Sequence, residues 1–432
     1  MQFLRSPHPL LRQFVVDGPI IESLLDVDFY TFTMQAYIRR YHPGTHVRFG
    51  LRNRTKIPLG RSIREGELRE QLDHVRSLRA TRSECHYLAG TFEYGRRMFD
   101  DAYIDWFANL QLPEYDLEYL PDGHIRLEFA GDWEAALHWE TIGMPILTQL
   151  YFKSLLKNMM TIECDAVVAE GIRRLHEKIQ MVQQRCASGR PFSFAEFGTR
   201  RRAFRDWQRY TDAMFGESLP GQYLGTSNTL NAMLLGQQPM GTNAHQLQMV
   251  AVALASSGSD EDMRAASRQV YERWWEMFGH GLSIALPDTY GTPAGLEDLG
   301  ASGAGYWKGT RQDSGSPERD TDRKIAWYLS HDIDPREKLL LYSDGLTFPR
   351  AFAIDDYRAG AIKKSFALGT NATNDFPVPS ALSIVVKPLR ANVFGCVKLS
   401  DNPAKAQGDA ELIQRYCRVF RYQEGERTEC VY

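Results

Sequence analysis

The chain has 432 residues, of which 43% are hydrophobic and 24% charged, and its formal net charge at pH 7 is -3. This length predicts two domains, and the composition is typical of a soluble globular protein. The near-neutral charge gives no indication of a nucleic-acid partner, and no apolar run has the length of a membrane span. The N-terminus lacks the apolar core of a signal peptide, and the six cysteines show no CxxC pair and no zinc spacing. We therefore expect a cytoplasmic protein with reduced thiols.

The first part of the chain, residues 1–140, predicts an α+β domain. Residues 21–41 have the apolar spacing of a helix that Asp26 or Asp28 would cap, with Tyr30 in its first turn. The other elements expected in this domain are a strand over 45–51, helices within 65–112 and a hairpin over 117–131. We expect the C-terminal tail, 388–432, to join this domain.

From residue 141 a different pattern begins, in which a short apolar run is followed by a polar turn and then a helix. The seven runs lie near Phe194, Tyr223, Met240, Ile284, Trp307, Leu339 and Phe366, and residues 382–387 could add an eighth. Strands that alternate with helices indicate a parallel sheet, and this number of units favours a barrel over an open sheet. We therefore predict an irregular (β/α) barrel over residues 141–387, with its active site where the strands end.

The stretch from Pro239 to Gln246 predicts a strand end, a tight turn and a helix whose first turn carries His245. The N-terminus of a helix has free backbone N–H groups and a positive dipole end, which suit a phosphate. A neutral imidazole at this place could accept a phosphoryl group. The alternative is that His245 only caps or packs against the helix.

The polar residues that follow the other predicted strands form a candidate site for a phosphorylated ligand. Turn amides at Gly345 and at Gly369–Thr370 can cradle a phosphate, because glycine lets the backbone approach closely. Asp313 and Asp344 can hold Mg²⁺ or ribose hydroxyls, and arginines can grip phosphate or carboxylate. The other members of this set are Arg200, Arg201, Thr226, Ser227, Thr242, Asp288, Arg311, Ser314, Ser343 and Asn371. Taken singly, the arginine run could be a solvated face and the glycine turns could be plain turns, and the chain has no P-loop.

Eight blocks of the sequence, in their order along the chain, resemble nicotinate phosphoribosyltransferase. They are residues 23–30, 196–202, 225–228, 239–245, 311–315, 342–346, 366–371 and 397–403. The resemblance implies an irregular α/β barrel with an N-terminal α/β domain. It also implies transfer of phosphoribose from phosphoribosyl pyrophosphate to nicotinate, coupled to ATP hydrolysis, as a step of NAD salvage.

The resemblance also implies roles for single residues. In the family the histidine that matches His245 is transiently phosphorylated, residues matching Tyr30, Thr242 and Arg311 contact nicotinate, and the one matching Thr370 contacts the phosphoribosyl substrate. Gln246 is a departure, because many bacterial relatives have glutamate followed by tryptophan there, and this puts the efficiency of ATP coupling in question. Together, the residues and the resemblance predict His245 as the catalytic residue and Asp313 as a magnesium ligand. The predicted substrate-binding residues are Tyr30, Arg200, Ser227, Thr242, Arg311, Asp313, Ser343, Gly345, Gly369 and Thr370.

The choice of pyridine is expected to depend on charge. The related enzyme that uses nicotinamide carries aspartate where this chain has Ser227, and aspartate would repel the carboxylate of nicotinate. Ser227 and Thr242 can donate to that carboxylate, Arg311 supplies positive charge, and the pocket therefore fits nicotinate. Ser227 could instead only cap the following helix, which would leave the selectivity to Arg311 and Thr242.

Two other classes of function stay open at this point. A barrel lyase or aldolase for a sugar phosphate would need a lysine or paired carboxylates at the mouth, and Lys308 is the only lysine candidate there. A nucleotide-binding regulator would bind phosphoribosyl pyrophosphate without turnover. The sequence leaves the oligomeric state open, a homodimer included, as well as the residues that bind the adenine of ATP.

Overall fold

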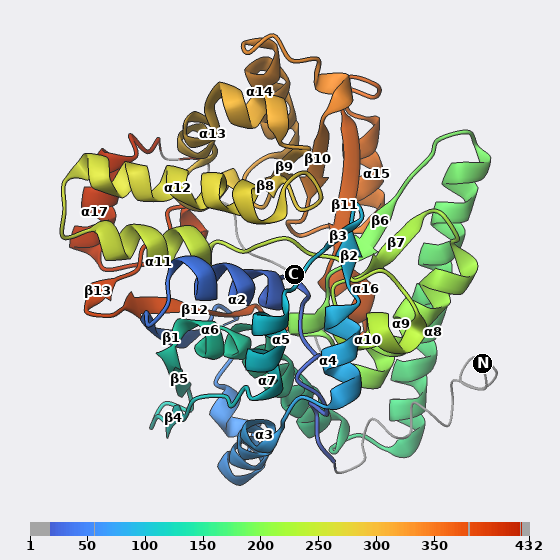
Figure 1. The fold of residues 1–432 in the computed structure, drawn as a ribbon. Coiled ribbons are helices and arrows are strands. Elements are labelled where there is room, and N and C mark those ends of the chain that lie inside the picture. The colour runs from blue at the N-terminus through green and yellow to red at the C-terminus, as the bar shows by residue number, and fades with distance from the viewer. Residues whose placement is uncertain (1–17, 56, 379–380, 424, 426–432) are drawn as a thin grey trace.

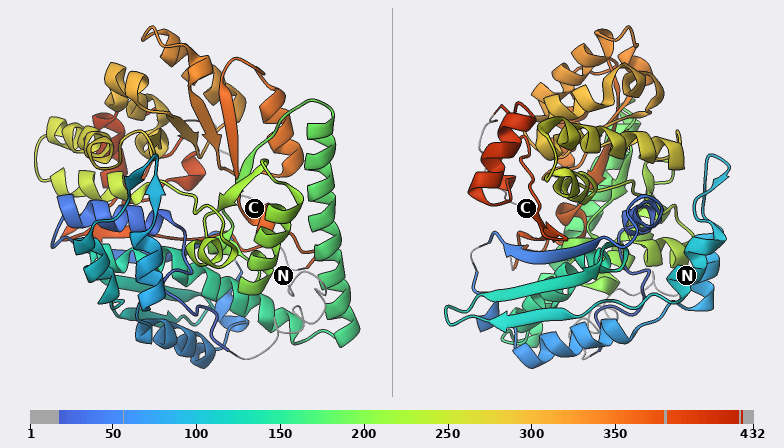
Figure 2. Two further views of the ribbon diagram at one scale, coloured as in Figure 1. Left: turned by 45° about the vertical axis from the view of Figure 1, so that its right-hand side comes forward. Right: turned by 60° about the vertical axis from the view of Figure 1, so that its left-hand side comes forward.

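The structure of the chain, a computed structural model, describes residues 18–55, 57–378, 381–423 and 425. It contains a five-stranded antiparallel sheet and a six-stranded parallel sheet. Figures 1 and 2 show the antiparallel sheet at the lower end of the molecule and the parallel sheet above it. Within the part of the chain that the structure describes, none of the helices has the length and apolar character needed to cross a membrane.

The antiparallel sheet has the strand order β13-β12-β1-β5-β4. Its strands are β1 (His46–Asn53), β4 (Tyr115–Tyr119), β5 (Ile125–Asp132), β12 (Ile384–Ala391) and β13 (Phe394–Gly395). The predicted strand over 45–51 and hairpin over 117–131 are therefore confirmed. The eighth barrel strand suggested for 382–387 is wrong, because that segment is β12, which runs antiparallel to β1 with Val386 opposite Leu51. The apolar residues of β12 are buried under α7 and β1 rather than inside a barrel.

Helix α2 (Tyr30–Tyr41) begins later and is shorter than the helix predicted over 21–41, and the other helices around this sheet lie between residues 65 and 187. These others are α3 (Glu65–Ser77), α4 (Arg82–Ala89), α5 (Asp101–Ala108), α6 (Trp133–Ala136), α7 (His138–Leu156) and α8 (Thr161–Ala187). The predicted cap of the first helix is wrong, because Phe29 occupies the N-cap of α2 and no side chain caps it. Asp26 and Asp28 instead pair with Arg202 and Arg200, which lie almost 180 residues further along the chain. A small hairpin, β2 (Phe92–Glu93) and β3 (Arg96–Arg97), interrupts the helical region.

The parallel sheet has the strand order β7-β6-β11-β10-β9-β8. Its strands are β6 (Phe194–Glu196), β7 (Tyr223–Thr226), β8 (Ile284–Ala285), β9 (Gly309–Gln312), β10 (Leu339–Tyr342) and β11 (Lys363–Leu368). The last strand, β11, lies beside the first, β6, as in a (β/α) barrel. The barrel is irregular because its seam falls between β7 and β8.

At this seam the strand predicted before Gly241 does not form, and Pro239 makes only an isolated bridge to Thr226. The reason is the packing of α2 on this segment. Gly241 has a φ of 150°, and a Cβ added there would lie 3.0 Å from the backbone nitrogen of Tyr30. The segment is therefore a loop pressed against the start of α2, and this contact brings the N-terminal part of the chain to the barrel mouth.

Helices follow most of the barrel strands. They are α9 (Arg205–Ser218), α10 (Thr229–Leu235), α11 (Gln246–Ala255), α12 (Asp260–Phe278), α13 (Thr292–Tyr306), α14 (Pro317–Leu329), α15 (Phe348–Asp356) and α16 (Thr370–Thr373). The last helix, α17 (Ala410–Val419), packs against α12, and Phe420 stacks on Tyr290 at 4.1 Å between ring centroids. The tail thus contacts both parts of the molecule, since β12 and β13 belong to the antiparallel sheet.

Candidate active site

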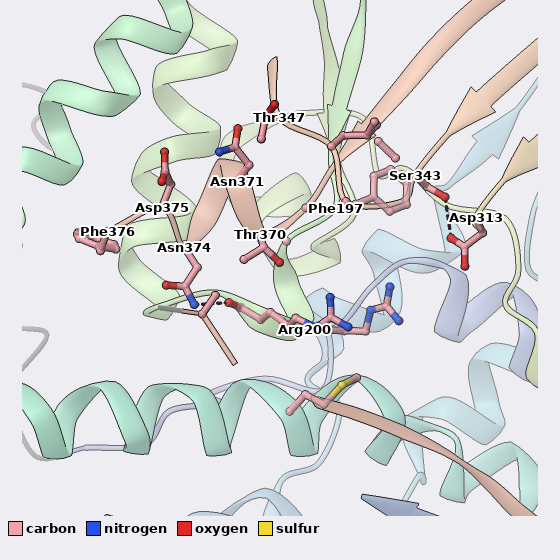
Figure 3. A pocket seen from close by; sticks show the side chains of 18 of the residues that line it. Phe197, Arg200, Asp313, Ser343, Thr347, Thr370, Asn371, Asn374, Asp375 and Phe376 are labelled. Carbon is pink, nitrogen blue, oxygen red and sulfur yellow. Dashed lines mark hydrogen bonds between the residues drawn. The ribbon is translucent and has the colours of Figure 1, made fainter. Parts of the chain in front are cut away.

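A cavity of about 410 Å³ lies at the C-terminal ends of β6, β9, β10 and β11, and we call it the mouth cavity. Figure 3 shows Thr370 and Asn371 on one side of it, Ser343 and Asp313 on the other, and Arg200 between them. Segments far apart in sequence meet here because parallel strands end at one edge of the sheet. Seven predicted site residues line this cavity: Arg200, Arg311, Asp313, Ser343, Gly345, Gly369 and Thr370.

A second cavity, of about 360 Å³, lies inside the barrel, and we call it the core cavity. Tyr30, Thr242 and Arg311 line it, together with apolar side chains of the barrel strands. The side chain of Tyr30 is buried, and its hydroxyl has no hydrogen-bond partner among the described residues. Arg311 lines both cavities, so a ligand in one would lie next to a ligand in the other.

The cations of the site are held by carboxylates. The Nε atom of Arg200 lies 3.2 Å from Oδ2 of Asp28, whose side chain is 1% exposed. Arg311 donates to Ser343 Oγ at 2.8 Å through Nε and to Asp313 Oδ1 at 2.7 Å through Nη2. Arg311 also donates to the carbonyl of Asn243 at 3.3 Å through Nη1. These contacts set the position of each guanidinium before an anion arrives, which favours tight binding.

His245 occupies the N-cap of α11 rather than its first turn. Its Nδ1 lies 3.0 Å from Thr289 Oγ1, and its Nε2 lies 3.0 Å from Asp313 Oδ2 and 3.6 Å from Asp288 Oδ1. Burial, with the nearby Lys398 ammonium, lowers the pKa of His245 to about 4 despite these two carboxylates. The imidazole is therefore neutral at pH 7. An ionised carboxylate only accepts, so Nε2 carries the proton and Nδ1 accepts from Thr289.

The carboxylates beside His245 fit a divalent cation. One ligand atom each from His245, Asp288 and Asp313 lies within 4.8 Å of the others. Burial alone would raise the pKa of Asp313, but Arg311 and His245 hold it well below the usual range. Oδ1 of Asp288 is buried and accepts no hydrogen bond from the described residues. Mg²⁺ prefers one or two carboxylates together with water and phosphate oxygens, and these two aspartates could provide the carboxylates.

Two site lysines come from the C-terminal tail. Lys405 donates to Asp344 Oδ1 at 2.6 Å and to the backbone oxygen of Asp313 at 2.7 Å. Lys398 Nζ lies 3.9 Å from Asp288 Oδ2. The strand-and-turn pattern could not indicate them, because they follow no barrel strand. The resemblance of residues 397–403 to the family was the only signal, and it pointed to Lys398.

Two of the predicted site residues, Ser227 and His245, line neither cavity. The Ser227 hydroxyl is fully buried and donates to Oδ1 of Asp28 at 2.6 Å, and Thr199 Oγ1 lies 3.2 Å from it. The Ser227 backbone N–H donates to the carbonyl of Glu196 at 2.8 Å. Asn228, not Ser227, caps the following helix α10. Ser227 therefore reaches the mouth cavity only through the Asp28 carboxylate that holds Arg200.

Lys308, the residue a lyase would need, does not line the mouth cavity; it lines the core cavity at the N-terminal end of β9. It directly precedes β9, and its Nζ lies 3.0 Å from the hydroxyl of Tyr94 in the hairpin β2–β3. The mouth cavity thus has no lysine from a barrel strand among the described residues that line it.

Comparisons with known proteins agree with this geometry. Residues 192–424 match the nicotinate phosphoribosyltransferase (NAPRTase) family, and residues 25–148 match the N-terminal domain of that family. The nicotinate phosphoribosyltransferase of Vibrio cholerae is 28% identical, with a TM-score of 0.84 over 95% of this chain and 96% of that one. The enzyme from Porphyromonas gingivalis is 25% identical, with a TM-score of 0.81 over 93% of this chain and 100% of that one. The chain therefore belongs to the nicotinate phosphoribosyltransferase family.

Proposed function

We propose that the chain transfers the phosphoribosyl group of phosphoribosyl pyrophosphate to the ring nitrogen of nicotinate, releasing pyrophosphate, and couples this transfer to ATP hydrolysis through His245. The observation that carries the proposal is the arrangement around Arg311. This residue lies between the mouth cavity and the core cavity, and its partner Asp313 accepts from the neutral His245.

The transfer itself needs little acid–base chemistry. The pyridine nitrogen of nicotinate has a free lone pair, so no general base has to remove a proton. Positioning of the two substrates and stabilisation of the departing pyrophosphate are then the main contributions. Nicotinate would lie at Tyr30 and Thr242, and the phosphates would lie in the mouth cavity beside Arg200 and the turns at Gly345 and Gly369.

The phosphoryl transfer to His245 also requires the movement of a proton. In this tautomer the free lone pair is on Nδ1: it attacks the terminal phosphorus of ATP, the bond to ADP breaks, and Asp313 accepts the Nε2 proton of the resulting imidazolium. A phosphorylated imidazole adds negative charge beside Asp288 and Asp313, which Lys398 and Lys405 would offset. Mg²⁺ held by Asp288 and Asp313 would neutralise phosphate charge in the same place.

Selectivity for nicotinate is proposed to depend on Arg311 and Thr242. Arg311 lines the core cavity and supplies positive charge for a carboxylate. Ser227 donates its single hydroxyl hydrogen to Asp28 and has none left for a substrate. Its contribution would be to keep the Asp28 carboxylate in place.

The experiment that tests this function measures nicotinate mononucleotide and pyrophosphate from nicotinate and phosphoribosyl pyrophosphate, with and without ATP. Formation of both products, stimulated by ATP, is the expected result. Binding of phosphoribosyl pyrophosphate without product would indicate a regulator. A preference for nicotinamide would contradict the proposed selectivity, and pyrophosphate release that ignores ATP would contradict the coupling.

A further inference from the structure

A buried ion pair lies beside the mouth cavity and has no role in the mechanism above. Glu140 on α7 has a fully buried side chain, and its Oε1 accepts from Nζ of Lys387 on β12 at 2.5 Å. Figure 3 shows α7 running beneath Arg200 as the floor of the mouth cavity, and Met144, one turn after Glu140 on this helix, lines that cavity. A buried ion pair is costly to desolvate and is weak evidence for stability, so its presence here calls for another reason.

The hydrogen bond to Glu140 leaves other N–H donors of the Lys387 ammonium available. This ammonium has three N–H donors, and among the described residues its one hydrogen-bond partner is Glu140. The Lys387 side chain is 12% exposed, so it is not completely buried, although it lines neither cavity. Burial lowers the pKa of Lys387, and the charges of Arg200 and Asp313 also act on that pKa. Two free donors thus lie within electrostatic reach of two residues that line the mouth cavity.

The other oxygen of Glu140 connects the pair to the helix of His245. Oε2 accepts from the side-chain amide of Gln246, the first residue of α11. The orientation of that amide follows from Trp133, because the indole N–H only donates and lies 2.8 Å from Oε1 of Gln246. The Gln246 amide nitrogen must therefore face Glu140. A glutamate at position 246 would instead place two carboxylates in contact.

From this geometry we propose that Lys387 is a further anion-binding residue of the site, and that Glu140 is the residue that positions it. The anion is a phosphate group of phosphoribosyl pyrophosphate, and to that extent the inference rests on the proposed function. Glu140 fixes the position of the Lys387 ammonium. Its hydrogen bond with Gln246 also connects the ion pair to the segment that carries His245.

The test titrates the full-length protein with phosphoribosyl pyrophosphate and Mg²⁺, with nicotinate, and with ATP in separate calorimetric experiments. The variants are Lys387→Met, Glu140→Gln and the double variant. Lys387→Met should raise the dissociation constant of phosphoribosyl pyrophosphate by ~10-fold or more, because one charge-assisted contact is lost. The dissociation constant of nicotinate should change by less than about 2-fold. Glu140→Gln should give a smaller loss of phosphoribosyl pyrophosphate affinity. The double variant should match Lys387→Met, because Glu140 acts on this ligand only through Lys387.

Arg185→Met is the matched control for losing a buried ion pair. Arg185 lies on α8, is 5% exposed, pairs with Asp355 at 2.6 Å, and lines neither cavity. Its phosphoribosyl pyrophosphate affinity should stay unchanged even where thermal stability falls. An unchanged affinity in Lys387→Met, or a loss confined to ATP, would overturn the proposal. Losses that add up in the double variant would overturn the positioning role of Glu140.

A second measurement needs no variant and covers the case in which Lys387→Met does not fold. The natural protein is treated with cyanate, and carbamylation of Lys387 is followed by mass spectrometry. Phosphoribosyl pyrophosphate with Mg²⁺ should protect Lys387, and nicotinate alone should not. Equal labelling of Lys387 with and without phosphoribosyl pyrophosphate would contradict the proposal that its ammonium binds this ligand. No labelling of Lys387 at all would contradict it as well. If the natural protein formed no nicotinate mononucleotide from nicotinate and phosphoribosyl pyrophosphate, that result would instead contradict the proposed function.

Discussion

Replacing Ser227 by aspartate tests how closely the Asp28 carboxylate controls this site. The Ser227 hydroxyl lies 2.6 Å from Oδ1 of Asp28, and both side chains are at most 1% exposed. Ser227→Asp would bring two carboxylates together in a buried place, so one of them should stay protonated in the folded state. Shifts of roughly 3–5 pKa units are typical of such pairs, which corresponds to about 4–7 kcal/mol at 1.36 kcal/mol per unit.

The sign of the effect follows from proton binding. The folded variant would keep a proton that the unfolded chain releases above a pKa of about 4, so the free energy of unfolding should fall as the pH rises. Between pH 5 and pH 8 the loss should be about 4 kcal/mol, a large part of the ~5–15 kcal/mol that stabilises a typical protein. Arg200, at 3.2 Å from Oδ2 of Asp28, can reduce this loss by pairing with the second charge.

The assay is denaturant unfolding at pH 5, 6, 7 and 8 for the natural protein, Ser227→Asp and Ser227→Asn. Asparagine has nearly the same shape as aspartate without the charge, and its amide can donate to Asp28, so it controls for size. We expect a difference between the two variants that grows with pH. In the same proteins, kcat/KM for nicotinate should fall more than ~10-fold in Ser227→Asp only, because a disturbed Asp28 no longer holds Arg200. Equal stability of the two variants at every pH would refute this reasoning.

Three further predictions concern Arg311 and His245. Arg311→Ala should lower kcat/KM by the equivalent of roughly 2–5 kcal/mol, because a buried anion and Asp313 both lose their partner; unchanged kinetics would remove Arg311 from the site. After incubation with ATP labelled in its terminal phosphate, the natural protein should carry an acid-labile, base-stable adduct. His245→Ala should lack this adduct and any stimulation by ATP, and a normal adduct in the variant would assign the phosphoryl group to another residue. Because the pKa of His245 is lowered to about 4, adduct formation should be constant from pH 8 to about pH 5 and fall below that. A midpoint near pH 6.5, the ordinary value for histidine, would show that the imidazole is not buried as described.

The sequence by itself determined the six strands of the barrel and many of the polar residues that line the mouth cavity. Apolar runs such as Phe194–Glu196 and Leu339–Tyr342 are strands because buried strands need several consecutive apolar residues, and the polar turns after them must meet at one edge. Local pattern is sufficient for these features, since each depends on neighbours in the chain. Gly345 and Gly369 could be assigned to the site for this reason.

The features that local pattern missed depend on contacts between distant segments. Residues 382–387 have the composition of a barrel strand, and only the edge offered by β1 decides that they join the other sheet. Asp26 and Asp28 have the sequence of helix caps, yet they pair with the buried Arg202 and the half-buried Arg200. Lys405 follows no barrel strand, and tertiary packing alone brings its ammonium to Asp313 and Asp344. A buried charge must find its partner in space, so its position in the sequence does not reveal where that partner lies.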